Sequence, residues 1–140
     1  MAERLLVVLV FAAAVTLAVI IVRRWNRRRV RALTQASAAL AWGKLRETPD
    51  GRRTLVTFST PSCAACHAAQ APAVKAVEAQ LGSSTVRVIG VDTARRPEVA
   101  RAFGVLTVPS TIVLAPNGQV VAVNQGFASS GRLVEQLQRA

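Results

Sequence analysis

The chain has 140 residues, a length that allows one domain of ordinary size. Hydrophobic residues make up 51% of it, which excludes a chain that is disordered throughout. Its two cysteines are too few for a small fold held together by disulfides. The net charge of +11 would suit a nucleic-acid-binding protein if it were spread over one face, so its position along the chain decides that question.

The segment 1–31 is predicted to contain a single transmembrane helix followed by a basic juxtamembrane stretch. Residues 5–22 include no charge, Pro or Gly, and as a helix they would span about 27 Å, close to the thickness of a bilayer core. Thr16 is the only polar residue of this run, so the amphipathic stripe of a soluble helix is missing. Because Trp25 and the neighbouring arginines suit the headgroup region, residues 5–31 are expected to contact membrane lipid.

The distribution of arginines indicates how this span is oriented. Arg4 stands before it beside Glu3, whereas six arginines follow it within nine residues: Arg23, Arg24, Arg27, Arg28, Arg29 and Arg31. A cleaved signal peptide would carry its positive charge before the apolar run. The positive-inside rule therefore places the C-terminal domain in the cytoplasm, with an extracytoplasmic domain as the alternative. From residue 54 onward basic residues exceed acidic ones by only three, so no binding to nucleic acid is expected.

Helices and strands alternate along the rest of the chain. A helix is predicted over 30–45 and a turn at 48–51, and the connecting region over 32–53 leads into a domain over 54–140. Strands are predicted at 54–59, 86–91, 110–114 and 119–123, and helices at 63–81, 97–103 and 129–139. Pro72 predicts a kink in the helix that ends at Gly82, and Asn117-Gly118 predicts a hairpin. This order implies an α/β fold with a mixed sheet flanked by helices on both faces, with Trp42, Phe58 and Phe103 in its core.

Cys63 and Cys66 form a Cys-Ala-Ala-Cys motif where a predicted strand passes into a predicted helix. Backbone N–H groups at a helix start favour a thiolate, so Cys63 is expected to be the exposed nucleophile. Cys66 lies one helical turn further on, close enough to bond to Cys63 and to resolve a mixed disulfide formed there. The pair is thus typical of thiol-disulfide exchange, since packing of two inert thiols explains this placement poorly.

Several further sequence features stand before and after this motif in a fixed order along the chain. The strand over 54–58 precedes it, Val91-Asp92 ends the next strand, and Phe103-Gly104-Val105 leads to Val108-Pro109-Ser110, before the Asn117-Gly118 hairpin and Gly126. This set resembles the thioredoxin family over about the last ninety residues. The resemblance implies a thioredoxin-like fold and an oxidoreductase that acts on protein thiols and disulfides without a cofactor. It also implies that Pro109 is a cis-proline beside the disulfide and that the backbone of Val108 pairs with an extended substrate.

Three auxiliary residues depart from the family pattern or stand beside the motif. Ser62 occupies the usual place of a Trp, Ala64-Ala65 replaces Gly-Pro, and Thr57 stands where the family has a buried Asp that assists proton transfer. These differences favour a resemblance to the membrane-tethered thioredoxin-like proteins of bacteria, whose substrates are often specialised. His67 is expected to face solvent, and a role in proton transfer stays open for it because Thr57 cannot act as a base.

Other functions fit parts of the same motif. Residues 63–67 also match the attachment pattern for c-type haem, but His67 is the only histidine and Met1 the only methionine, so a usual second axial ligand is missing. Zinc would need a fourth ligand, which only a site shared between subunits would supply. No metal or cofactor is therefore expected. Two alternatives to a membrane-anchored oxidoreductase are kept: a binding module for a membrane partner without turnover, and an exported thiol reductase of cytochrome maturation.

Overall fold

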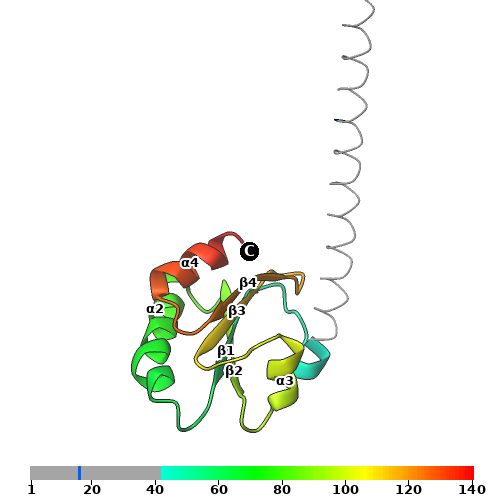
Figure 1. Ribbon diagram of the computed structural model, residues 1–140. Helices are drawn as coiled ribbons and strands as arrows, with labels where there is room; N and C mark the ends of the chain where they lie inside the picture. The colour runs from blue at the N-terminus through cyan, green and yellow to red at the C-terminus, as the bar shows by residue number, and fades with distance from the viewer. Residues whose placement is uncertain (1–15, 17–41) are drawn as a thin grey trace, which may run out of the picture. The chain divides into compact units, whose positions relative to one another are not determined.

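The computed structural model describes Thr16 and residues 42–140, and the main elements of the domain fall close to their predicted places (Figure 1). The four strands are β1 (Arg53–Ser59), β2 (Val86–Asp92), β3 (Ser110–Leu114) and β4 (Val120–Gln125). The helices are α2 (Ala71–Leu81), α3 (Pro97–Ala102) and α4 (Ser130–Gln138), with a π-helical segment, η1 (Cys66–Gln70), directly before α2. The predicted α/β class is confirmed, and the ends of these strands and of α3 and α4 differ from the predicted ends by no more than two residues.

The predicted membrane run and most of the helix predicted over 30–45 lie outside the described residues, apart from Thr16 in the former and residues 42–45, which are helical. In the part of the chain that the structure describes, no helix combines the length and the apolar character needed to cross a membrane. The transmembrane helix accordingly stays a prediction.

The four strands form one mixed sheet in the order β2-β1-β3-β4. β1 runs parallel to β2 and antiparallel to β3, which in turn is antiparallel to β4. In this register Ser59 pairs with Asp92, Phe58 with Ser110, and Ser110 with Gln125. The ends of β1, β2 and β4 and the start of β3 therefore meet at one edge of the sheet, and the segment carrying both cysteines leaves from this edge.

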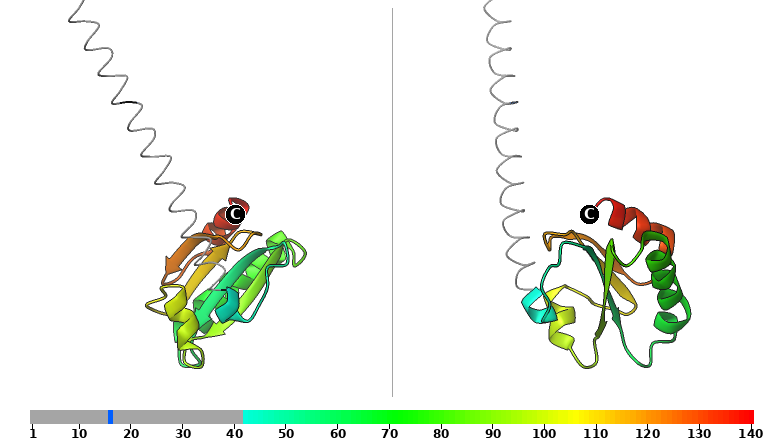
Figure 2. Two further views of the ribbon diagram at one scale, coloured as in Figure 1. Left: turned by 90° about the vertical axis from the view of Figure 1, so that its right-hand side faces the viewer. Right: turned by 180° about the vertical axis from the view of Figure 1, so that it is seen from behind.

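Helices cover both faces of the sheet, α2 and α4 on one face and α3 on the other (Figure 2). Successive strand side chains point to opposite faces, so Leu55 packs under α2 and α4 while Val56 faces α3. Each face thus has its own cluster of buried hydrophobic side chains, and a few polar residues, among them Gln70 and Asn124, are buried as well. As predicted, Trp42 and Phe58 are buried, and the partly buried Phe103 meets the Phe58 ring edge-on with centroids 5.8 Å apart.

The helix that follows the cysteines is less regular than the sequence suggests. Instead of one α-helix kinked at Pro72, the chain forms η1 and changes to α-helical hydrogen bonding at α2. At the junction the Ala71 N–H bonds to the carbonyl of Cys66, five residues back. Pro72 then lies in the first turn of α2, where its missing N–H is tolerated. Gly82 ends α2 with a φ of 79°, as predicted.

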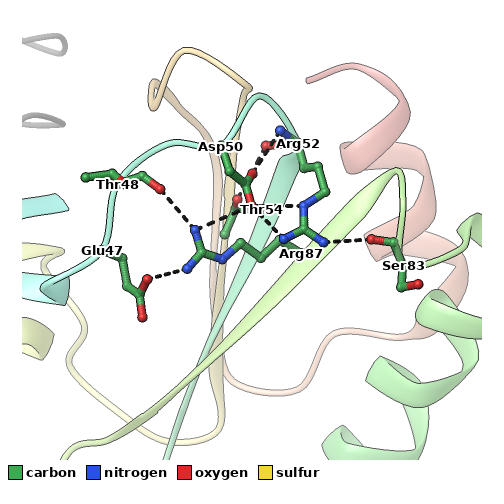
Figure 3. A network of polar contacts seen from close by, with 7 residues as sticks. All are labelled: Glu47, Thr48, Asp50, Arg52, Thr54, Ser83 and Arg87. Carbon is green, nitrogen blue, oxygen red and sulfur yellow. Dashed lines mark hydrogen bonds and ion pairs between the residues drawn. The ribbon is translucent and has the colours of Figure 1, made fainter.

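Polar contacts connect the segment before β1, residues 47–52, to β2 and to the loop that contains Ser83 (Figure 3). Arg87 of β2 donates to the Thr48 carbonyl at 3.0 Å and pairs with the Glu47 carboxylate. Arg52 pairs with Asp50 at 2.6 Å and donates to the Ser83 carbonyl at 2.8 Å. Hydrogen bonds from the side chain and then the backbone of Arg52 lower the pKa of Asp50 below its ordinary value of 3.8.

Candidate redox site

Cys63 and Cys66 are joined by a disulfide, with sulfur atoms 2.12 Å apart and Cα atoms 5.3 Å apart. Cys63 is half-buried, whereas Cys66 is only 5% exposed. Cys63 is therefore less exposed than predicted, but it is the more accessible residue of the pair, and the predicted resolving residue is the protected one.

Local hydrogen bonds place Cys63 at the start of the helix. Its carbonyl accepts the N–H of His67 at 3.3 Å, while its own N–H bonds to the Thr60 carbonyl at 3.1 Å. Its sulfur accepts the N–H of Cys66 at 3.1 Å, the contact that an N-cap side chain makes with the third helical residue. The helix begins at Ala64, so Cys63 occupies the N-cap position. The same N–H would stabilise a thiolate on Cys63 in the reduced protein.

The Val108-Pro109 segment approaches the same edge of the sheet. Its peptide bond is cis, which confirms the prediction for Pro109. Pro109 is buried and immediately precedes Ser110, which pairs with Phe58 near the end of β1. Val108 is half-buried and packs against the core under α3. The sheet register thus brings the segment that the resemblance assigns to substrate binding to the edge from which the cysteines extend.

A pocket of about 260 Å³ lies behind the disulfide on the α2 face of the sheet. It brings together Thr57 of β1 and Cys66, and it is also lined by His67 and Gln70. Glu78, the lining carboxylate, lies on α2 about three helical turns beyond Cys66. Thr57 therefore lines the same pocket as the resolving cysteine, and the carboxylate that lines this pocket belongs to a distant turn.

The two auxiliary residues on the exposed side of the motif differ in their contacts. Ser62 is exposed and does not line the pocket that holds Thr57. His67 is also exposed, which confirms its predicted position, and its Nε2 lies 3.2 Å from the carbonyl oxygen of Pro61. His67 thus borders both solvent and the pocket behind Cys66, whereas Ser62 faces solvent alone. Among the described residues, no three His, Cys, Asp or Glu side chains gather in a way that would hold a metal ion.

Two glutamines that no sequence motif identifies hold the loops beside this edge. Gln70 is buried, and its amide bonds to both the N–H and the carbonyl of Ala128, at 2.9 and 3.1 Å. Gln125, at the end of β4, bonds to the loop before Pro109. In the sequence, the only sign of such a residue is a glutamine that follows a largely apolar stretch. This sign does not reveal which distant residue the glutamine contacts.

The fold and the site together define a class of protein. A disulfide at a helix start, at the same edge of a mixed four-stranded sheet as a cis-proline, characterises a thioredoxin-like oxidoreductase fold. The family model for thioredoxin matches residues 44–139, which is most of the chain. The chain belongs to the thioredoxin family.

Individual relatives agree with this assignment. The SPbeta prophage-derived thioredoxin-like protein YosR of Bacillus subtilis (strain 168) is 34% identical over 73 residues, which are 52% of this chain and 81% of that protein. The thioredoxin of Fasciola hepatica is 27% identical with a TM-score of 0.54, over 64% of this chain and 81% of that one. The structure of MTB dsbF, in its mixed oxidized and reduced forms, is 23% identical with a TM-score of 0.52 and the same coverage, and this likeness concerns the fold alone.

Proposed function

We propose that the protein is a thiol-disulfide oxidoreductase that uses the Cys63–Cys66 couple on protein substrates. One observation carries the proposal: the Cys63 sulfur sits at the helix start and accepts the N–H of Cys66 at 3.1 Å. An N-cap sulfur in this position is stabilised as a thiolate, and the thiolate is the form that attacks disulfides. Membership of the thioredoxin family supports the same chemistry.

In the reducing direction the exchange takes two steps. The Cys63 thiolate attacks one sulfur of the substrate disulfide, which forms a mixed disulfide and releases the other substrate sulfur as a thiolate. Cys66 then loses its proton, and its thiolate attacks the Cys63 sulfur. This second step closes the Cys63–Cys66 disulfide and releases the second substrate thiol, so two electrons pass from the protein to the substrate. An external dithiol returns them.

The proton on Cys66 needs a route out of a buried position. Thr57 cannot accept it near neutral pH, because a hydroxyl is far too weak a base. The pocket lined by Thr57, Cys66 and His67 opens the buried side of Cys66 to solvent. The proton leaves through this pocket, to water or to His67.

Turnover of a protein disulfide tests the proposal. With dithiothreitol as electron donor, the wild-type protein should accelerate insulin reduction, whereas Cys63→Ser should not exceed the rate of dithiothreitol alone. Cys66→Ser should also lose catalytic turnover, because its mixed disulfide is no longer resolved from within. A wild-type rate equal to that of dithiothreitol alone would contradict the proposal and favour a binding module without turnover.

We also propose that residues 5–31 anchor the domain to a membrane, with the domain on the cytoplasmic side. The support is the uncharged run 5–22 and the six arginines that follow it. In cells that express the full chain, a membrane-impermeant thiol reagent added after reduction should leave both cysteines unlabelled until the cells are lysed. Labelling in intact cells would place the domain outside and favour an exported reductase.

A further inference from the structure

The loop between α3 and β3 is held by one side chain from a different part of the chain. The Gln125 Nε2 donates to the carbonyl of Gly104 at 2.8 Å, and its Oε1 accepts the N–H of Leu106 at 3.1 Å. Ser110 Oγ lies 3.2 Å from the same Oε1 but only 2.7 Å from the Thr107 carbonyl oxygen. Because the hydroxyl has a single proton, it donates that proton to the closer Thr107 carbonyl. Gln125 therefore fixes the loop through two backbone groups, one donor and one acceptor.

The position of Gln125 follows from the sheet register. Gln125 pairs with Ser110, the residue directly after Pro109, so β4 ends beside the loop that enters β3. Gly104 turns the chain there with a φ of 67°. A primary amide offers a donor and an acceptor on one planar group, which suits a loop that presents a carbonyl and an N–H two residues apart. A carboxylate or an aliphatic side chain cannot make both bonds.

The loop held in this way displays an apolar side chain. The backbone N–H of Leu106 donates to Gln125, yet the Leu106 residue is 90% exposed. Val108 follows two residues later, next to the cis peptide bond with Pro109. An exposed leucine on a fixed loop, at the sheet edge from which the cysteine segment also extends, is suited to contact a partner.

We propose that Gln125 is a positioning residue for substrate binding. It holds residues 104–108 so that the Leu106 side chain and the Val108 backbone meet an extended segment of a protein substrate that carries an apolar residue near its disulfide. This inference rests on the oxidoreductase function proposed above. Because the loop is fixed before the substrate arrives, less conformational freedom is lost on binding. Gln125 itself is exposed, so water competes for its bonds and the fold does not depend on them.

The test compares a protein substrate with a small disulfide. Gln125→Met keeps the length of the side chain but removes both hydrogen-bonding groups. Its KM for insulin should rise about 3- to 10-fold, the factor expected for the loss of one or two exposed hydrogen bonds, with kcat unchanged. Its rate with cystamine, which has no peptide segment to contact the loop, should equal that of the wild type. Gln80→Met, at an exposed position on α2, is the matched control and should leave both substrates unaffected.

Three results would overturn the inference. An unchanged KM for insulin in Gln125→Met would show that the loop needs no such support. An equal loss with cystamine would mean that Gln125 acts on the disulfide chemistry and not on substrate binding. A lower melting temperature together with losses on both substrates would indicate a general structural role. Failure of the oxidoreductase proposal is distinguishable, because then the wild-type protein itself would not reduce insulin.

Discussion

At the scale of single residues, the two sulfurs of the redox pair have different surroundings. Cys63 is half-buried and sits at the N-cap of the helix, whereas Cys66 is buried within η1. In the reduced protein near neutral pH, Cys63 should react with iodoacetamide at least about tenfold faster than Cys66, because it is both more accessible and better stabilised as a thiolate. Mass spectrometry of the alkylated peptides measures the two rates. Equal rates, or a faster Cys66, would contradict the assignment of nucleophile and resolving residue.

The residues of the site differ in how far the sequence alone reveals them. Cys63 and Cys66 form a local motif at a strand-to-helix junction, and Pro109 is found through its place in an ordered set of family features. Gln70 and Gln125 were missed because their function depends on contacts across the fold. Gln70 bonds to a residue 58 positions away, and Gln125 bonds to residues 19 and 21 positions away. Single-sequence patterns report spacing within an element, and they do not report which loops two elements bring together.

At the scale of elements, the β3–β4 hairpin depends on a close approach between Gly118 and Trp42. Gly118 has a φ of 82°, and a Cβ built there would lie 2.2 Å from the indole Nε1 of Trp42. Gly118→Ala should therefore lower the free energy of unfolding by about 2–4 kcal/mol, from backbone strain together with displacement of the buried ring. Thermal or urea unfolding measures the loss.

Gly51→Ala is the matched control for this prediction. Gly51 has the same φ of 82°, but a Cβ there meets no atom within 4 Å. This variant should show only the strain of the left-handed backbone, about 1 kcal/mol or somewhat more. Equal losses for the two variants would mean that the contact with Trp42 adds nothing to the stability of the hairpin.

The elements were predicted well where hydrophobic pattern and turn residues agree. The strand at 110–114 matches β3, and the Asn117-Gly118 signal matches the turn between β3 and β4. The register shifts between Val113 and Leu114, where Leu114 pairs with Val120. β4 also continues to Gln125, because the polar Asn124 and Gln125 still pair with β3, so the strand ends later than its apolar pattern suggests. The π-helical segment was not foreseen, because a proline in a helical pattern indicates a break without specifying the hydrogen bonding that accommodates it.

At the scale of the whole molecule, the charge network of Figure 3 should make stability depend on pH in the acid range. The bonds from Arg52 lower the pKa of Asp50, so the contribution of Asp50 is present above its ordinary value of 3.8. It is lost as the pH falls through the lowered pKa of the folded protein. Asp50→Asn should thus be slightly less stable than the wild type at neutral pH, and the difference should vanish in acid.

Unfolding midpoints of both proteins across the acid range measure this effect. Asp50 and Arg52 lie at the surface, so added salt should reduce the difference at neutral pH. A difference that stays constant as the pH falls below the ordinary pKa of Asp50 would contradict the assigned role of its carboxylate.

Trapping of covalent complexes tests whether Cys63 exchanges disulfides with protein partners and Cys66 resolves them. Membranes or lysate incubated with reduced Cys66→Ser protein should yield covalent complexes on a non-reducing gel that disappear on reduction, because Cys63 still attacks while its competitor is gone. Cys63→Ser should trap no partner. If Cys66→Ser gave no reductant-sensitive complex while the wild-type protein bound partners without a covalent bond, Cys63 would not be a nucleophile toward protein disulfides.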